Sequence, residues 1–200
     1  MKIILASGSP RRKELLKELL YKYNLTYDVV PSEIDESLIK DQYKEPGKLV
    51  KQLSYIKAQD IFEINKNKYD NLIVIGGDTI VYFENEFLGK PKNEEHAKNM
   101  LQRMQGKINN VYTGLTVIIK LGNKVIFDTS FKKANVYMKK INDQEIDEYI
   151  KTKEPMDKAG AYAIQGIGNK YIEKYKGKFN VVVGLDTEKI ESILKKYKII

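Results

Sequence analysis

The sequence predicts an α/β protein built on a mixed β-sheet, and three observations indicate this class. Short apolar runs typical of buried strands alternate with helical patterns along the first half of the chain. A Gly-Asn turn then separates two β-rich runs, 111–121 and 124–138, which adds a long antiparallel hairpin. The chain has 200 residues, of which 42% are hydrophobic and 31% charged, so it can bury the core of one domain or of two closely packed lobes.

The individual elements follow from local patterns. Up to the hairpin we expect a strand over 2–6, a helix from Pro10, a strand over 26–30, a helix from Pro46 to about 65, strands over 72–76 and 79–83, and a helix over about 93–104. Ser9 is the expected N-cap of the first helix, and Gly76–Gly77 is expected to break the apolar strand. After the hairpin we expect a helix over 142–152, glycine-rich loops with short strands over 157–184, and a last helix that begins near Asp186.

Composition excludes several kinds of site. Cysteine is absent, so disulfides, thiol catalysis and thiolate metal sites are excluded. Because His96 is the single histidine, multi-histidine metal sites and a Ser–His triad are nearly excluded. Any metal must therefore be held by oxygen, which points to Mg²⁺ or Mn²⁺. No apolar run reaches the roughly 18 residues that a membrane span needs. The apolar run near the N-terminus is too short for a signal peptide. We therefore expect a cytoplasmic protein.

The net charge of +8 is compatible with several partners. Only 3 of the 35 basic residues are arginines, and we interpret most of the charge as a solvated lysine surface. A nucleic-acid-binding protein is the alternative, and its binding should vanish at about 0.2 M salt if attachment is purely electrostatic. The tyrosines are dispersed and do not interleave with basic residues as they do on an RNA-binding sheet.

The segment from Ser7 to Arg12 is the strongest candidate for an anion site. It lies between a predicted strand and a predicted helix, where free backbone N–H groups and the helix dipole favour an anion. Arg11 and Arg12 oppose that dipole unless an anion binds there. Two of the chain's three arginines stand at this place, and arginine gives bidentate contacts with phosphate oxygens. Phosphate binding is favoured over a plain helix start.

Three further motifs are less specific. Asp78 follows an apolar strand and two glycines that would let a ligand approach, although an aspartate in a tight turn has the same pattern. In extended form Glu33 and Asp35 would share a face and could hold Mg²⁺, but an exposed acidic loop is also compatible. Lys90 stands between a glycine and a proline, which suits either a phosphate contact or a turn. The two common glycine-rich nucleotide motifs are absent.

Eight segments, in order, resemble the Maf-like nucleotide pyrophosphatases and span nearly the whole chain. They are LASGSPRRKELL (5–16), PSEIDES (31–37), SYIKA (54–58), GGDTIV (76–81), LGKP (88–91), VYTG (111–114), DKAGAYAIQG (157–166) and NVVVGL (180–185). The resemblance implies a single Maf-like domain over 1–200, with a two-lobed mixed sheet flanked by helices and a central cleft. It also implies hydrolysis of nucleoside triphosphates to monophosphate and pyrophosphate with a divalent metal, Mg²⁺ or Mn²⁺.

The resemblance further implies roles for particular residues. The triphosphate site would be lined by Ser7, Arg11, Arg12, Lys57 and Lys90. Glu33 and Asp78 would form an acidic pair that holds the metal, with Asp78 as the proton acceptor. Substrate choice is linked to Arg11, Thr79 and Gln165. The run that contains Gln165 is similar to the branch acting on dTTP and UTP, and its amide offers a donor and an acceptor to the edge of thymine or uracil.

The resemblance leaves alternatives open. A pyrophosphatase of the same family that prefers 7-methyl-GTP is one of them. Another is a non-catalytic nucleotide sensor linked to cell division arrest, although a sensor would not need Asp78 and Glu33. Expected partners are small-molecule nucleoside triphosphates, with no specific nucleic acid or membrane and with a possible homodimer. Three positions depart from the family pattern: Gly77 replaces a usual alanine, Asn109 a frequent histidine, and Asp186 a common proline.

Overall fold

The computed structural model describes the backbone of residues 1–200 and every side chain except that of Leu38. Its strands are β1 (Lys2–Leu5), β2 (Asp28–Val29), β3 (Asn71–Phe83), β4 (Glu86–Leu88), β5 (Ile108–Leu121), β6 (Lys124–Met138) and β7 (Ile172–Lys176). Its α-helices are α1 (Pro10–Tyr21), α2 (Ser37–Lys40), α3 (Pro46–Asn65), α4 (Glu94–Met104), α5 (Asp143–Lys151), α6 (Phe179–Val183) and α7 (Thr187–Lys196). Three 3₁₀ helices complete the chain: η1 (Glu154–Asp157), η2 (Ala159–Ala161) and η3 (Ile167–Tyr171).

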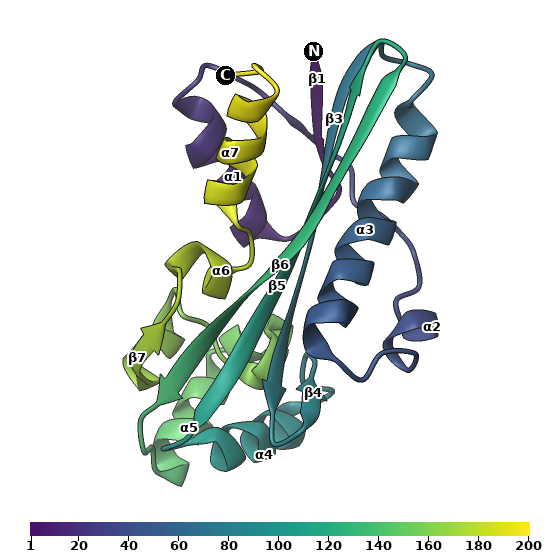
Figure 1. Cartoon of the computed structure of the whole chain (residues 1–200). Coiled ribbons are helices and arrows are strands. Elements are labelled where there is room, and N and C mark those ends of the chain that lie inside the picture. Colours follow the sequence, from purple (N-terminus) through teal and green to yellow (C-terminus); the bar gives the residue numbers. More distant parts are fainter. The chain divides into compact units, whose positions relative to one another are not determined.

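The strands form one seven-stranded sheet in the order β2-β1-β3-β5-β6-β7, with β4 paired to β3 (Figure 1). Strand β1 pairs in parallel with β2 and with β3, whereas β3–β4 and β6–β7 are antiparallel. The predicted α/β class with a mixed sheet is therefore confirmed. Within the described residues, none of the helices combines the length and the apolar character needed to cross a membrane.

The chain divides into two compact units. The first comprises residues 1–78, 113–132 and 184–200, and the second comprises residues 79–112 and 133–183. Strands β3, β5 and β6 each contribute residues to both units, because their bounds span the points of division.

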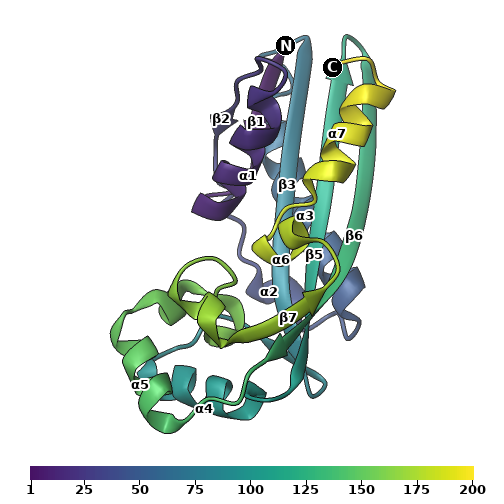
Figure 2. The ribbon, with the colours of Figure 1, turned by 90° about the vertical axis from the view of Figure 1, so that its left-hand side faces the viewer.

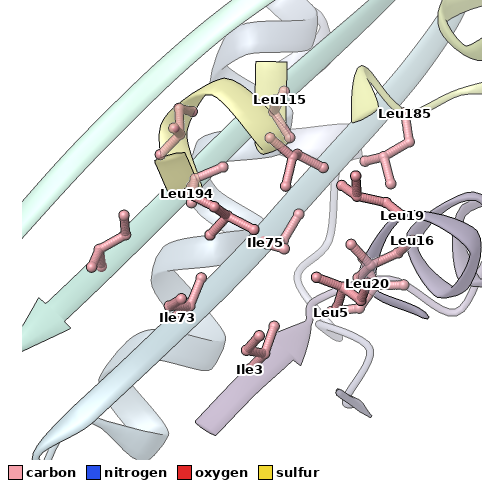
Figure 3. Close-up of a cluster of buried hydrophobic side chains, with 14 residues drawn as sticks. Ile3, Leu5, Leu16, Leu19, Leu20, Ile73, Ile75, Leu115, Leu185 and Leu194 are labelled. Atoms are coloured by element: carbon pink, nitrogen blue, oxygen red, sulfur yellow. The ribbon is translucent and has the colours of Figure 1, made fainter. Parts of the chain in front are cut away.

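In the first unit, helices cover both faces of the strands: α1 and α7 on one face and α3 on the other (Figure 1). Successive strand residues point to opposite faces, so Ile3 and Leu5 pack toward α1 and α7 while Ile4 packs toward α3. Figure 3 shows the core beneath α1 and α7, where leucines of both helices meet isoleucines of β1 and β3.

Two glycines let helix α3 approach the strands unusually closely. A Cβ at Gly76 would lie 2.3 Å from the Ser54 carbonyl oxygen, and one at Gly114 would lie 2.0 Å from that of Val50. The prediction that Gly76 and Gly77 break the apolar strand is wrong, because β3 runs without interruption from Asn71 to Phe83. The side chain is missing at Gly76 to make room for helix packing rather than to permit a turn.

The helix starts follow the predicted signals closely. Helices α1 and α3 begin at Pro10 and Pro46, and the Asp186 side chain caps α7 by accepting a hydrogen bond from the Lys189 N–H at 3.2 Å. Ser9 does occupy the N-cap position of α1, but its side chain makes no capping hydrogen bond there.

In the second unit, α4 and α5 lie side by side (Figure 2) and are joined by an ion pair of 2.7 Å between Lys98 and Asp147. A reciprocal capping box starts α5, since Asn142 and Glu145 each bond the other's backbone N–H at 2.9 Å. The short elements α2, β4, α6 and the three 3₁₀ helices were not predicted individually, because segments of this length lack a periodic apolar pattern.

Candidate active site

The first unit places its polar cluster at the switch point of the parallel strands. The chain leaves β1 through α1 on one face to reach β2, then returns through α3 on the other face to reach β3. The strand order therefore reverses between β1 and β3, whose Leu5 and Ile75 are paired in register. Ligands of open α/β sheets bind beyond the carboxyl ends of the strands at such a point. Ser7 follows the end of β1 here, and Asp78 lies on β3 beyond its last pairing with β1.

Arg12 is fixed at the start of α1 by two hydrogen bonds. Its Nη1 donates to Ser7 Oγ at 3.0 Å, and its Nε donates to the Gly184 carbonyl oxygen at 2.8 Å. Burial lowers the pKa of Arg12, Asp78 acts in the opposite direction, and the neighbouring Arg11 lowers it again. The first turn of α1 carries no acidic residue. Because two guanidinium groups and the helix dipole are all positive, this end of α1 favours a bound anion.

Lys57 joins two carboxylates beside this arginine. From the middle of α3, its Nζ donates to Asp78 Oδ1 at 2.7 Å and lies 2.6 Å from Glu36 Oε1. The Lys57 and Asp78 side chains are only 13% and 10% exposed, so water screens this contact weakly. Burial by itself would raise the pKa of Glu36, but the charges and hydrogen bonds of Lys57 and Lys40 together lower it to about 2.

The structure thus brings together four of the predicted phosphate-site and catalytic residues, namely Ser7, Arg12, Lys57 and Asp78, and it adds Glu36. Arg11 is half-buried and close enough to affect the pKa of Arg12. Glu33 and Asp35, expected to share an extended face, are both exposed, and the Asp35 carboxylate accepts a hydrogen bond from the Ser37 N–H at 2.9 Å.

Sequence reasoning missed Glu36. The acidic run is evident in the sequence, but the turn that begins at Glu36 and leads into α2 determines which of its carboxylates points toward Lys57. A signal was available in Lys40, which lies one helical turn after Glu36 and pairs with it at 2.9 Å.

The second unit carries the other three predicted residues, Thr79, Lys90 and Gln165. Lys90 is exposed, and the turn before it is tied to η2 by a hydrogen bond of 3.0 Å from the Gly160 N–H to the Gly89 carbonyl oxygen. Thr79 and Gln165 are half-buried. Gln165 lies in the loop between η2 and η3.

Asn109 is fully buried in the part of β5 that belongs to the second unit. Its Oδ1 accepts a hydrogen bond of 2.7 Å from the Tyr162 hydroxyl. Burial raises the pKa of Tyr162, which therefore stays a neutral donor. Asn109 thus anchors the segment that leads to Gln165.

The donor set around Lys57 fits a hard divalent cation. Asp78 and Glu36 offer the carboxylate oxygens that Mg²⁺ and Mn²⁺ prefer. Among the described side chains, no group of three or more histidine or acidic residues forms a metal cluster. Two carboxylates completed by phosphate oxygens and water are a common arrangement for Mg²⁺ bound together with a polyphosphate.

A half-buried arginine and lysine beside two carboxylates, at the switch point of the parallel strands, define an α/β protein suited to bind a phosphorylated ligand. Comparison with known families makes this specific: a family model described as Maf-like protein matches residues 2–197, and the chain belongs to this family.

Curated relatives match over nearly the full length. The chain is 43% identical over 195 residues to a dTTP/UTP pyrophosphatase of Caldicellulosiruptor bescii, and the match covers 98% of this chain and 94% of the relative. It is 43% identical over 196 residues to the dTTP/UTP pyrophosphatase of a Thermoanaerobacter species, with 98% and 96% covered. It is 42% identical over 198 residues to that of Bacillus cereus, with 99% and 96% covered.

Proposed function

We propose that this protein is a nucleoside triphosphate pyrophosphatase that hydrolyses dTTP and UTP to the monophosphate and pyrophosphate. Membership of the Maf-like family and the names of the full-length relatives support this activity. The observation that carries the proposal is the contact of Lys57 with Asp78 and Glu36 next to the Arg12–Ser7 pair. This arrangement combines cations for a polyphosphate with a carboxylate for proton transfer.

The start of α1 binds the phosphates. Arg11 and Arg12 supply guanidinium donors, and Ser7 holds Arg12 in place through its hydroxyl group. Lys57 adds a positive charge from α3, and the resemblance assigns a further phosphate contact to Lys90. Positive groups at these positions neutralise the charge that develops on the departing pyrophosphate.

Hydrolysis begins with attack of a water oxygen on the α-phosphorus, which breaks the bond to the β-phosphate. Asp78 accepts the proton of that water, and pyrophosphate leaves with the electron pair of the broken bond. Lys57 orients the Asp78 carboxylate by donating to its Oδ1. Asp78 and Glu36 would hold Mg²⁺ or Mn²⁺, which supplies charge neutralisation and lowers the pKa of the attacking water.

Glu36, rather than Glu33, takes the second acidic role. Glu36 contacts Lys57, whereas Glu33 is exposed. Glu36→Gln should therefore weaken activation by Mg²⁺ more than Glu33→Gln does, measured as the metal concentration that gives half-maximal rate. A larger effect at Glu33 would restore the assignment made from the resemblance.

Base choice is assigned to Gln165, together with Arg11 and Thr79, by the resemblance. The test is pyrophosphate release across dTTP, UTP, CTP, the purine triphosphates and 7-methyl-GTP, with the monophosphate product identified. Preference for dTTP and UTP is expected. Preference for 7-methyl-GTP would overturn the choice of base but not the reaction, and tight binding without turnover would indicate a nucleotide sensor.

Asp78→Asn tests the proton acceptor. The substitution keeps size and shape, so nucleotide affinity should stay within about tenfold while kcat falls by about 10²–10⁴. Turnover close to that of the unmodified protein would end this assignment.

A further inference from the structure

The loop that carries Gln165 is anchored on both sides by two neighbouring side chains of the second unit. Before Gln165, the Ala163 N–H donates to the Tyr149 hydroxyl oxygen at 3.3 Å. After it, the Ile167 and Gly168 N–H groups donate to Oε1 and Oε2 of Glu154 at 3.0 and 2.7 Å. A carboxylate that accepts two successive backbone N–H groups fixes the path of the chain more firmly than a single neutral bond does.

Tyr149 and Glu154 are themselves held in place. Tyr149 is 1% exposed and its ring packs against that of Tyr171, with centroids 5.1 Å apart. Burial and, next, its hydrogen bond with Glu154 raise the pKa of Tyr149, so its hydroxyl group remains protonated. Lys153 precedes Glu154 in the left-handed conformation, with φ of 63°, and turns the chain into η1.

The loop also lies directly against this pair. A Cβ at Gly166 would lie 2.1 Å from Glu154 Oε1, and one at Gly168 would lie 2.3 Å from the Tyr149 hydroxyl oxygen. Gly166 further adopts a φ of 94°, which disfavours any residue with a side chain. Both glycines therefore allow the backbone to approach the anchors closely.

We propose that Glu154, supported by Tyr149, is a positioning residue that fixes Gln165 for recognition of the nucleotide base. The inference rests on the proposed function, from which the role of Gln165 comes. An amide can distinguish one pyrimidine base from another only when its oxygen and nitrogen are held in one orientation, since rotation exchanges hydrogen-bond donor and acceptor. Anchoring the backbone on both sides of Gln165 fixes the point and the direction from which its side chain reaches the base.

The test compares Glu154→Gln with Glu173→Gln, a control on β7 whose exposed carboxylate pairs with Lys174. In Glu154→Gln one carboxylate oxygen becomes an NH₂ group, which cannot accept from a backbone N–H. The readout is the ratio of kcat/KM for UTP to that for CTP. We expect Glu154→Gln to lower this ratio roughly tenfold, in line with one lost hydrogen bond. KM for UTP should rise while kcat stays within about threefold, and the control should change neither.

A double variant separates positioning from a general structural effect. If Glu154 acts through Gln165, then Glu154→Gln added to Gln165→Ala should not lower the ratio further. Tyr149→Phe, which keeps the ring and removes the hydroxyl group, should lower the ratio in the same direction. It provides the test if Glu154→Gln does not fold.

The outcomes are distinct. A normal UTP-to-CTP ratio in Glu154→Gln with a lowered melting temperature would overturn the inference, because Glu154 would then serve the fold alone. A ratio that falls equally in the presence and absence of Gln165 would overturn it as well. If the unmodified protein hydrolysed no triphosphate, the proposed function would fail and this inference with it.

Discussion

Substitution of Gly76 by alanine tests how closely α3 must pack against β3. The new Cβ would lie 2.3 Å from the Ser54 carbonyl oxygen, 2.8 Å from Ala58 Cβ and 2.9 Å from Ala58 N. All three atoms belong to α3, and a relaxed contact of this kind needs more than 3 Å. The helix must therefore move by about 1 Å, because its backbone cannot rotate away as a side chain can.

The expected loss follows from the core beneath the helix. Moving α3 loosens the contacts of Ala58, Ile61 and Phe62 with Ile4 and Val74. Overpacking of a dense core typically lowers the unfolding free energy by 1–3 kcal/mol. We expect about 2–4 kcal/mol here, because the clash involves the backbone, and a fall in Tm of roughly 5–12 °C. Urea and thermal unfolding followed by circular dichroism would measure both.

Gly77→Ala is the matched control. A Cβ at Gly77 would lie 3.3 Å from Arg12 Nε and 3.4 Å from Leu185 Cδ1, and its φ is not in the left-handed region. The unfolded chain loses freedom with alanine, so stability should stay within about 1 kcal/mol of that of the unmodified protein. Equal stability of Gly76→Ala and Gly77→Ala would refute the close approach of α3 to β3 at Gly76.

Three further predictions concern single interactions. Asn109→Ala leaves the buried Tyr162 hydroxyl without its acceptor and should lower the unfolding free energy by about 1–3 kcal/mol. When Tyr162 is already replaced by phenylalanine, Asn109→Ala should cost much less stability. Equal losses with and without the Tyr162 hydroxyl would contradict the hydrogen bond between the two side chains. The pKa of Glu36 is lowered from 4.5 to about 2 in the folded state, so its contribution is complete above pH 4.5 and is lost as the pH falls toward 2. Urea unfolding should therefore show a steeper acid loss for the unmodified protein than for Glu36→Gln, whereas parallel curves would refute this. Lys57→Met leaves two neighbouring carboxylates without their shared cation and should lower the unfolding free energy by about 2–4 kcal/mol. Adding Asp78→Asn to this variant should restore part of the lost stability. If the effects of the two substitutions on the unfolding free energy were simply additive, the coupling between Lys57 and Asp78 would be contradicted.

The sequence predicts best those features that depend on local signals. Prolines at positions 10 and 46 mark the starts of α1 and α3 because proline fits the first helical turn without losing a hydrogen bond. Gly122, with a φ of 57°, marks the turn of the long hairpin for a similar local reason. Ser7 and Arg12 could be selected from their place after a strand and at a helix start, and the structure joins them by a hydrogen bond.

Features that depend on distant contacts could not be predicted in this way. The sequence favours a strand break at Gly76 because it does not reveal that α3 packs directly against the strand there. Lys57 is one of 32 lysines, and only the fold distinguishes it, by placing Asp78 and Glu36 against it. Glu36 could not be separated from Glu33 and Asp35 without knowing where the acidic run turns.

The close packing of α3 links the stability of the first unit to the geometry of its candidate active site. Lys57 and Ala58 are neighbours on this helix, and Ala58 packs at Gly76, shortly before Asp78 on β3. The contact that makes Gly76 necessary therefore also sets the distance from which Lys57 reaches Asp78. A displacement of about 1 Å is large for a hydrogen bond of 2.7 Å, whose strength falls steeply with distance and angle. Changes that loosen α3 should consequently impair the Lys57–Asp78 contact, and with it the proposed hydrolysis, at temperatures where the helices remain folded.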